Sequence, residues 1–152
     1  MKQIAVHCDG ACLGNGSLNA RAGWGVVVSE NDALLTSKNG KVPGAQTSIR
    51  AEIYAFLQAL LYIQESAYTD VVIATDSYEV VMAVTGKTKR NSNRDIWVAI
   101  EKASLELACR NIKVKHCNKK VLDPKDVYYR ANVKADLLAF EGAQKLFDLL
   151  EE

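Results

Sequence analysis

The stretch "DVVIATDS", residues 70–77, decides the fold of this chain. Four consecutive apolar residues, "VVIA", stand between polar ones, and a short apolar run of this kind is typical of a strand that is buried on both faces. Such strands occur in parallel sheets covered by helices. The run is followed by Asp76, so a carboxylate comes just after a buried strand, where a lone charge is costly to desolvate.

A second strand with the same ending opens the chain. Residues 2–8, "KQIAVHC", predict a strand, and Asp9 and Gly10 follow it before a loop over residues 10–21. The carboxyl ends of parallel strands meet at one edge of a sheet, where ligands bind in open α/β folds. We therefore expect Asp9 and Asp76 to lie side by side. Taken singly, each acid also fits a turn former or a helix cap.

The order of predicted elements is βββαβααβα, with a long basic loop before the last helix. Further strands are predicted at residues 23–30, 34–42 and 111–115, helices at residues 47–66, 77–84, 94–109 and 132–150, and the loop at residues 116–131. The fourth and fifth strands are reached through helices, so right-handed crossovers should make them parallel to the first. This predicts an α/β fold, a mixed five-stranded sheet flanked by helices.

Length and composition favour one domain over residues 1–152. The chain has 152 residues, 49% of them hydrophobic, which is enough for a sizeable core. It contains no apolar run long enough for a membrane span and does not open like a secretory signal, so we expect a cytoplasmic protein. Its four cysteines show no CxxC spacing and are interpreted as reduced thiols. The small size favours a monomer.

The charge is unevenly distributed along the chain. Residues 1–85 carry 5 basic and 8 acidic side chains, residues 86–134 carry 13 and 5, and residues 135–152 carry 1 and 5. A basic middle segment beside acidic flanks fits a polyanion binder with a separate cation site. It also fits a lysine-rich surface that only faces solvent.

Two more acids can join the pair at the sheet edge. Glu52 falls in the first turn of the long predicted helix, and Asp136 in the first or second turn of the last one. Carboxylates gathered at one point repel each other and need a cation, and hard oxygen ligands suit Mg²⁺ or Mn²⁺. Two such ions about 4 Å apart are a common device for in-line phosphodiester cleavage. Glu52 could instead complement a helix dipole, and Asp136 could be a solvated surface acid.

Four segments, in this order, resemble type 1 ribonuclease H: "CDGACLGNG", "SIRAEIYAFLQAL", "VVIATDSYEVV" and "NVKADLLA". With the order of elements, the resemblance spans about residues 2–147. It implies a ribonuclease H-like fold and an endonuclease that hydrolyses the RNA strand of RNA–DNA hybrids, leaving 5′-phosphate and 3′-hydroxyl ends. It further implies that two Mg²⁺ ions, replaceable by Mn²⁺, are held by the catalytic acids Asp9, Glu52, Asp76 and Asp136.

The same resemblance implies a set of substrate-binding residues. Asn15 matches a minor-groove contact, and Thr47 and Ser48 match the region that contacts DNA phosphate and hybrid sugars. The full set is Gly10, Asn15, Thr47, Ser48, Arg50, Ser77 and Asn132, joined by the basic residues Lys87, Lys89 and Arg90. Polar side chains in the minor groove can distinguish the strand that carries 2′-hydroxyls, and lysines supply sequence-independent affinity for phosphates.

Three departures from the family pattern are visible. Residues 117–135 contain no histidine, although many members carry one there, and Lys119, Lys120, Tyr128, Tyr129 or Arg130 could replace it. The basic segment "TGKTKRNSNRDIW", residues 85–97, is too short for the family's full protrusion. Tyr78 stands where a polar amide is frequent. Two alternatives therefore stay open: a nuclease of this fold with another nucleic acid as substrate, and a non-catalytic module that binds RNA or hybrids.

Overall fold

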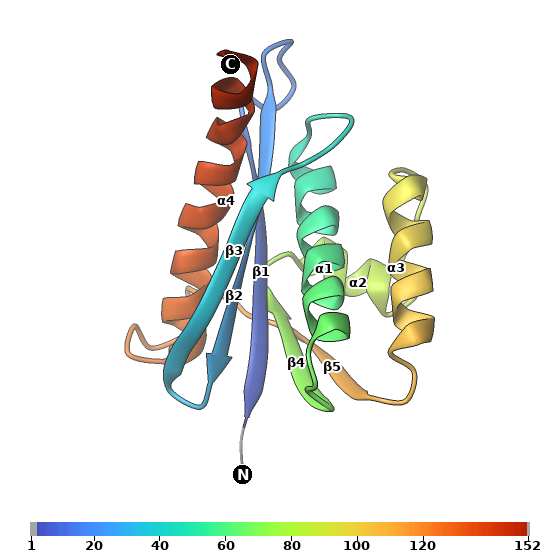
Figure 1. Ribbon diagram of the computed structural model, residues 1–152, viewed down its shortest axis with the longest axis vertical. Helices are drawn as coiled ribbons and strands as arrows, with labels where there is room; N and C mark the ends of the chain where they lie inside the picture. The colour runs from blue at the N-terminus through green and yellow to red at the C-terminus, as the bar shows by residue number, and fades with distance from the viewer. Residues whose placement is uncertain (1–2, 152) are drawn as a thin grey trace.

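The computed structural model describes residues 3–151, with side chains as far as Lys145 (Figure 1). Lys2, which the sequence places in the first strand, lies outside the described residues. The predicted order of elements is confirmed. The elements are β1 (Ile4–Leu13), β2 (Arg21–Glu30), β3 (Ala33–Lys41), α1 (Ser48–Glu65), β4 (Asp70–Thr75), α2 (Tyr78–Val84), α3 (Arg94–Glu106), β5 (Asn111–His116) and α4 (Val127–Glu151).

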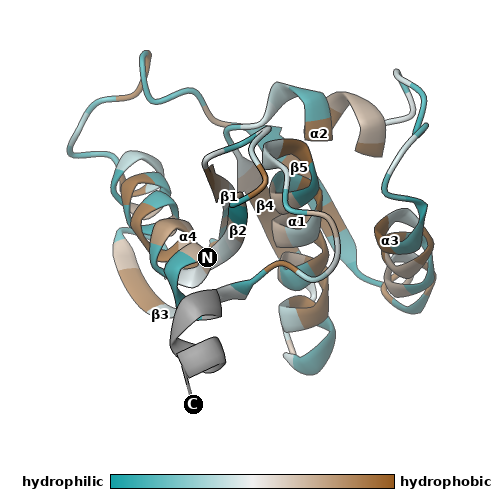
Figure 2. Cartoon of the chain, turned by 90° about the horizontal axis from the view of Figure 1, so that it is seen from above, coloured by the Kyte–Doolittle hydropathy of each residue, from teal (hydrophilic) through white to brown (hydrophobic). Residues whose placement is uncertain are grey.

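The five strands form one mixed sheet in the order β3-β2-β1-β4-β5. β4 pairs in parallel with both β1 and β5, as the crossover argument predicts, while β1, β2 and β3 form an antiparallel meander. Seen from above, α4 lies on one side of the sheet, and α1 and α3 lie on the other (Figure 2). No helix in the described part of the chain is long and apolar enough to cross a membrane.

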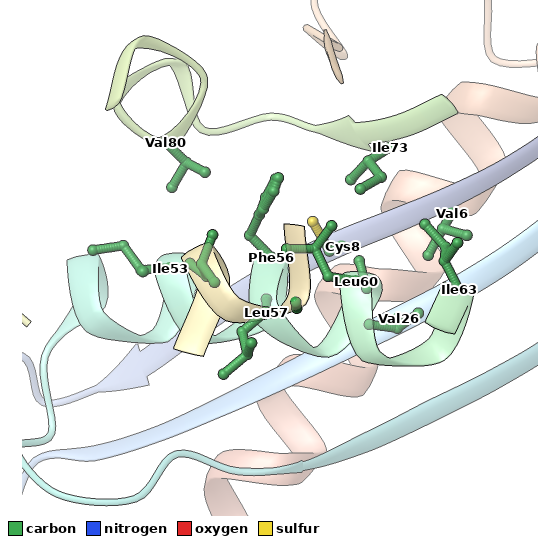
Figure 3. Close-up of a cluster of buried hydrophobic side chains, with 14 of the residues drawn as sticks. Val6, Cys8, Val26, Ile53, Phe56, Leu57, Leu60, Ile63, Ile73 and Val80 are labelled. Carbon is green, nitrogen blue, oxygen red and sulfur yellow. The ribbon is translucent and has the colours of Figure 1, made fainter. Parts of the chain in front are cut away.

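The larger core lies between the sheet and α1 (Figure 3). Apolar residues of α1 recur every three or four positions, namely Ile53, Phe56, Leu57, Leu60 and Ile63, and they pack with Val6, Cys8, Val26 and Ile73 of the strands. Thr47 caps this helix, because its side chain accepts a hydrogen bond from the backbone N–H of Arg50. Glu52 therefore lies in the second turn of α1, whereas the sequence analysis placed it in the first.

The opposite face of the sheet is packed against α4 through small residues. Gly23 and Gly25 of β2 lie under Ala135, Ala139 and Ala143 of the helix, and a Cβ atom added to Gly23 would lie 2.1 Å from the backbone nitrogen of Ala143. The backbones of strand and helix therefore touch directly. This close approach fixes the position of α4, and with it Asp136, relative to the sheet.

The first strand runs further than the sequence predicts. β1 stays paired with β2 as far as Leu13 opposite Arg21, whereas its parallel pairing with β4 ends at Cys8 opposite Thr75. The glycines after residue 9 suggested a loop, but a glycine also suits a strand that a helix approaches closely. Asp9 therefore lies inside β1, one residue beyond the point where β1 parts from β4.

The last helix begins at Val127, earlier than the predicted residue 132. Asp126 stabilises this earlier start, because its side chain accepts a hydrogen bond from the backbone N–H of Tyr128 at 2.8 Å. The loop after β5 thus shrinks to residues 117–126. Asp136 lies in the third turn of α4, not in the first or second.

Candidate metal centre

Three acidic side chains meet where β1 parts from β4. Asp9 comes from β1, Asp76 directly follows β4, and Glu52 approaches from α1. Each of the three can offer a carboxylate oxygen such that these atoms all lie within 4.8 Å of one another. The sheet edge predicted from the sequence thus brings together three of the four predicted acids.

Gly10 allows this convergence by letting α1 touch β1. A Cβ atom at position 10 would lie 2.3 Å from the carbonyl carbon of Ala51, so the helix can come this close only to a glycine. The N–H of Gly10 donates hydrogen bonds to Glu52 Oε1 and, at 2.9 Å, to Asp9 Oδ1. One backbone donor therefore orients two of the three carboxylates.

Burial and mutual repulsion disfavour the charged forms of these acids. Asp9 is only 4% exposed, and its burial, followed by the charge of Glu52, raises its pKa well above the usual range. Burial also raises the pKa of Glu52 to about 7. The pKa of Asp76 is raised by burial as well, an effect that the nearby charge of Lys119 opposes. A donor set of repelling carboxylate oxygens, one buried and two half-buried, fits a hard divalent cation, which would neutralise it.

The three acids lie in an open cleft of about 870 Å³. Asp136 contributes an exposed carboxylate to its wall, outside the close group of three. Its charge still acts on Asp9 and Asp76, since it helps to raise the pKa of both. The fourth predicted acid thus belongs to the same cleft at a greater distance from the centre.

Five of the ten predicted substrate-binding residues also line this cleft. Asn15, Thr47, Ser48 and Ser77 form part of its wall, as does Gly10. The side chain of Asn15 accepts a hydrogen bond from the N–H of Ser48 at 3.0 Å, which ties the loop after β1 to the start of α1. Ser77 caps α2.

Asn132 differs from these residues. It is 2% exposed in α4 and does not line the cleft, and no described residue bonds its side-chain oxygen.

The family model described as RNase H matches residues 1–144 of this chain. The chain belongs to the RNase H family. Ribonuclease H1 of Homo sapiens is 28% identical over 95% of this chain and 51% of its own length. Ribonuclease H of Xanthomonas oryzae pv. oryzae (strain MAFF 311018) is 30% identical over 68% of this chain and 73% of its own. The chain spans about half the length, or less, of the mammalian relatives.

A solved structure of the RNase H family shares this fold. The crystal structure of LC11-RNase H1 in complex with RNA/DNA hybrid superposes with a TM-score of 0.74 at 22% sequence identity. The match covers 95% of this chain and 99% of that one. The predicted ribonuclease H-like architecture is therefore confirmed.

Arg50 has a structural position that its place in the RNase H pattern does not reveal. Its side chain is 8% exposed, and its guanidinium donates two hydrogen bonds to Asp95, at 2.9 and 2.7 Å. Two more go to the carbonyl of Pro43 and the side chain of Asn93. Through these four hydrogen bonds Arg50 joins α1 to the start of α3, and it does not line the cleft.

In the basic segment between α2 and α3, one of the basic side chains is also bound within the protein. Arg90 lies over the ring of Trp97, 4.4 Å from its centre, and forms an ion pair with Glu101 at 3.1 Å. Lys87 and Lys89 are exposed but do not line the cleft. Of the three basic residues of this segment that were assigned to substrate binding, only these two lysines form no ion pair within the described residues.

An aromatic side chain, which stands where many family members have a polar amide, forms part of the cleft wall. Tyr78 lines the cleft and is 60% exposed. Its ring meets the ring of His116 edge to face, with centres 5.6 Å apart, and His116 Nε2 lies 3.2 Å from the carbonyl oxygen of Asp76. Glu79 lines the cleft as well. In the sequence, the position of Tyr78 directly after Asp76 and Ser77 was the signal that it could line the cleft.

Replacing Glu52 by Gln should stabilise the metal-free protein in a pH-dependent way. The pKa of Glu52 rises from 4.5 to about 7 on folding, so wild type loses stability as the pH rises through that window, whereas Gln does not titrate. We expect the variant to be more stable by on the order of 2–3 kcal/mol at pH 7.5, and by almost nothing at pH 4.5.

Thermal unfolding in a chelator across this pH range measures the difference. The low pKa of buried His7, about 4, affects wild type and variant equally and cancels. A difference in stability that stays constant with pH would contradict the assignment.

Replacing Arg50 by Lys should destabilise the fold without impairing substrate binding. Lysine cannot reproduce the paired hydrogen bonds to Asp95, so we expect a loss of about 1–3 kcal/mol in unfolding free energy. Denaturant unfolding measures this loss, and steady-state kinetics on the folded variant should give an unchanged KM. A raised KM with unchanged stability would instead show that Arg50 contacts the substrate.

Proposed function

We propose that this chain is a metal-dependent endonuclease that hydrolyses the RNA strand of RNA–DNA hybrids, leaving 5′-phosphate and 3′-hydroxyl ends. The observation that carries the proposal is the convergence of Asp9, Glu52 and Asp76 in an open cleft. Membership of the RNase H family supports the choice of substrate. A single domain over residues 1–152, a monomeric state and a cytoplasmic location are further proposals, drawn from the sequence.

The proposed cofactor is a pair of Mg²⁺ ions, which Mn²⁺ can replace. Asp9, Glu52 and Asp76 would hold them, with Asp136 contributing from the cleft wall. When bound, two such ions activate a water molecule and stabilise the leaving oxygen of an in-line displacement. The fit rests on the donor chemistry, because one buried and two half-buried carboxylates with raised pKa values are unstable as a charged group without a cation.

The chain's own residues prepare the site in two ways. The Gly10 N–H holds Asp9 and Glu52 in place before any ligand arrives, so less reorganisation is needed during the reaction. The polar wall of Asn15, Thr47 and Ser77 offers donors and acceptors to sugar hydroxyls. Since only the RNA strand carries 2′-hydroxyls, such contacts can select it for cleavage.

The test is cleavage of a hybrid whose RNA strand is end-labelled, with Mg²⁺, with Mn²⁺ and with a chelator. Duplex DNA, duplex RNA and single-stranded RNA serve as parallel substrates. Metal-dependent cleavage confined to the RNA of the hybrid supports the proposal, and end-group analysis of the products checks the 3′-hydroxyl. Preferential cleavage of another substrate would make this a different nuclease, and hybrid binding without cleavage would make it a binding module.

A further inference from the structure

The edge strand β5 presents lysines on a sheet face that α4 leaves uncovered. α4 packs on β1, β2 and β3 (Figure 1). On β5, Ile112 and Val114 pack towards the large core, so the exposed Lys113 and Lys115 point to the opposite face. The ammonium group of Lys115 lies 4.4 Å from the ring centre of Tyr128 in the first turn of α4, which confirms this direction.

The loop after β5 extends this basic surface to the cleft. It is the largely hydrophilic segment, residues 117–126, that joins β5 to α4 (Figure 2). Buried Cys117 anchors it, with its N–H bonded to the carbonyl of Thr75 at 2.8 Å, and the side chain of Asn118 accepts the N–H of Lys120. Lys119 lies close enough to Asp76 for its charge to lower the pKa of that acid.

We call Lys113, Lys115, Lys119 and Lys120 the lysine face. Within residues 3–145, none of these four lysines forms an ion pair. The two acids of the adjacent loop, Asp123 and Asp126, form no ion pair with these lysines and accept hydrogen bonds from the backbone N–H groups of Lys125 and Tyr128. Residues 111–134 contain 7 basic and 2 acidic side chains. The lysine face therefore lies in a segment where basic side chains outnumber acidic ones, next to the metal centre.

We propose that the lysine face binds the phosphates of the nucleic-acid duplex where it extends beyond the cleft. Lys113 and Lys115 are two residues apart on one strand, about 6.6 Å, a length over which one strand of a duplex presents roughly two phosphates. The two ammonium groups can thus contact neighbouring phosphates of one backbone. Lys119 would contact the duplex phosphates nearer to Asp76.

This surface would compensate for the short basic segment between α2 and α3, where Arg90 is committed to Trp97 and Glu101. Phosphate contacts position a duplex without reading its sequence. The lysine face should therefore add affinity and length dependence but no sequence preference. That the duplex is an RNA–DNA hybrid rests on the proposed function.

The experiment compares Lys113→Gln/Lys115→Gln with a charge-matched control, Lys102→Gln/Lys145→Gln, whose lysines are exposed on α3 and late in α4. Both are made in an Asp76→Asn chain, so that the hybrid stays intact with Mg²⁺ present. Binding is measured against salt, with a short hybrid that only fills the cleft and one three times as long. Thermal unfolding checks that each variant is folded, and Lys113→Gln alone avoids the contact of Lys115 with Tyr128.

For the long hybrid, we expect the double variant to lose about 1.5–2 from the slope of log affinity against log salt, and Lys113→Gln alone about 0.9. With the short hybrid, and for the control variant with either hybrid, the slope should equal that of the Asp76→Asn chain with all its lysines. Equal slopes for variant and control, or an equal loss on both hybrids, would overturn the proposal. Cleavage by the unmodified chain is measured separately. If that chain cleaved no hybrid but the lysine variants still lowered the salt dependence of binding, the proposed function would be rejected and the proposed phosphate-binding surface would stand.

Discussion

Replacing Asp76 by Asn is expected to lower the rate of hybrid cleavage by about 10³-fold or more, with the fold intact. Asp76 is one of three carboxylates whose oxygen atoms lie within 4.8 Å of one another, and asparagine removes one negative charge from that group. Metal ions contribute several kcal/mol of transition-state stabilisation, and each 1.36 kcal/mol, roughly, is tenfold in rate. Single-turnover cleavage of the labelled hybrid at saturating Mg²⁺ measures the loss.

The matched control is Asp70→Asn, at the other end of the same strand. Asp70 is exposed and bonds the side chain of Asn111, far along β4 from the cleft. It carries the same charge change and should keep the wild-type rate. If both variants lost activity equally, the effect would come from the strand and not from the metal centre. An Asp76→Asn chain with the wild-type rate would remove this acid from the proposed mechanism.

Replacing Gly10 by Ala is expected to cost both stability and activity. The new Cβ atom would lie 2.3 Å from backbone atoms of α1, which cannot move aside as a side chain can. We expect a loss of about 3 kcal/mol or more in unfolding free energy. Because α1 carries Glu52, its displacement should also lower the rate of the folded variant, by about 10²-fold for a shift of roughly 1 Å.

Gly23→Ala separates these two effects. Its Cβ atom would meet the backbone of α4 at 2.1 Å, so the destabilisation should be similar. Gly23 does not line the cleft, and α4 carries only Asp136, which lies outside the close group of three acids, so the rate per folded molecule should fall less than in Gly10→Ala. Denaturant unfolding and cleavage rates, measured on both variants at a temperature where each is folded, give the comparison. Equal rate losses would argue against a specific role for Gly10 at the metal centre.

The features that follow from local pattern were predictable from the sequence. The apolar run before Asp76 specifies a central strand, and the spacing from Ile53 to Ile63 specifies the buried face of α1. Parallel crossovers then place Asp9 and Asp76 at one edge. Each of these inferences needs only periodicity and connection rules, and each is confirmed in the fold.

The features that depend on distant partners were not predictable. β1 continues past Gly10 because β2 keeps pairing with it, and neither strand alone shows this. The family resemblance included Arg50 and Arg90 in the substrate-binding set. Their contacts with Asp95 and Trp97 of α3 could not be read from that pattern. The early start of α4 depends on a hydrogen bond from one backbone N–H to Asp126, within a segment whose charges suggested a loop.

The separation of β1 from β4 after Cys8 has a consequence for how this chain can change in length. An insertion of one residue between Ile4 and Cys8 would turn every later side chain of β1 to the other face of the sheet, so Asp9 would point into the core against α1. The turn after Leu13 is exposed at residues 14–19, and no described strand pairs with it. Relatives of this chain should therefore differ in length in the part of that turn after Asn15 and Gly16, which line the cleft, and keep a constant number of residues from the start of β1 to the acid.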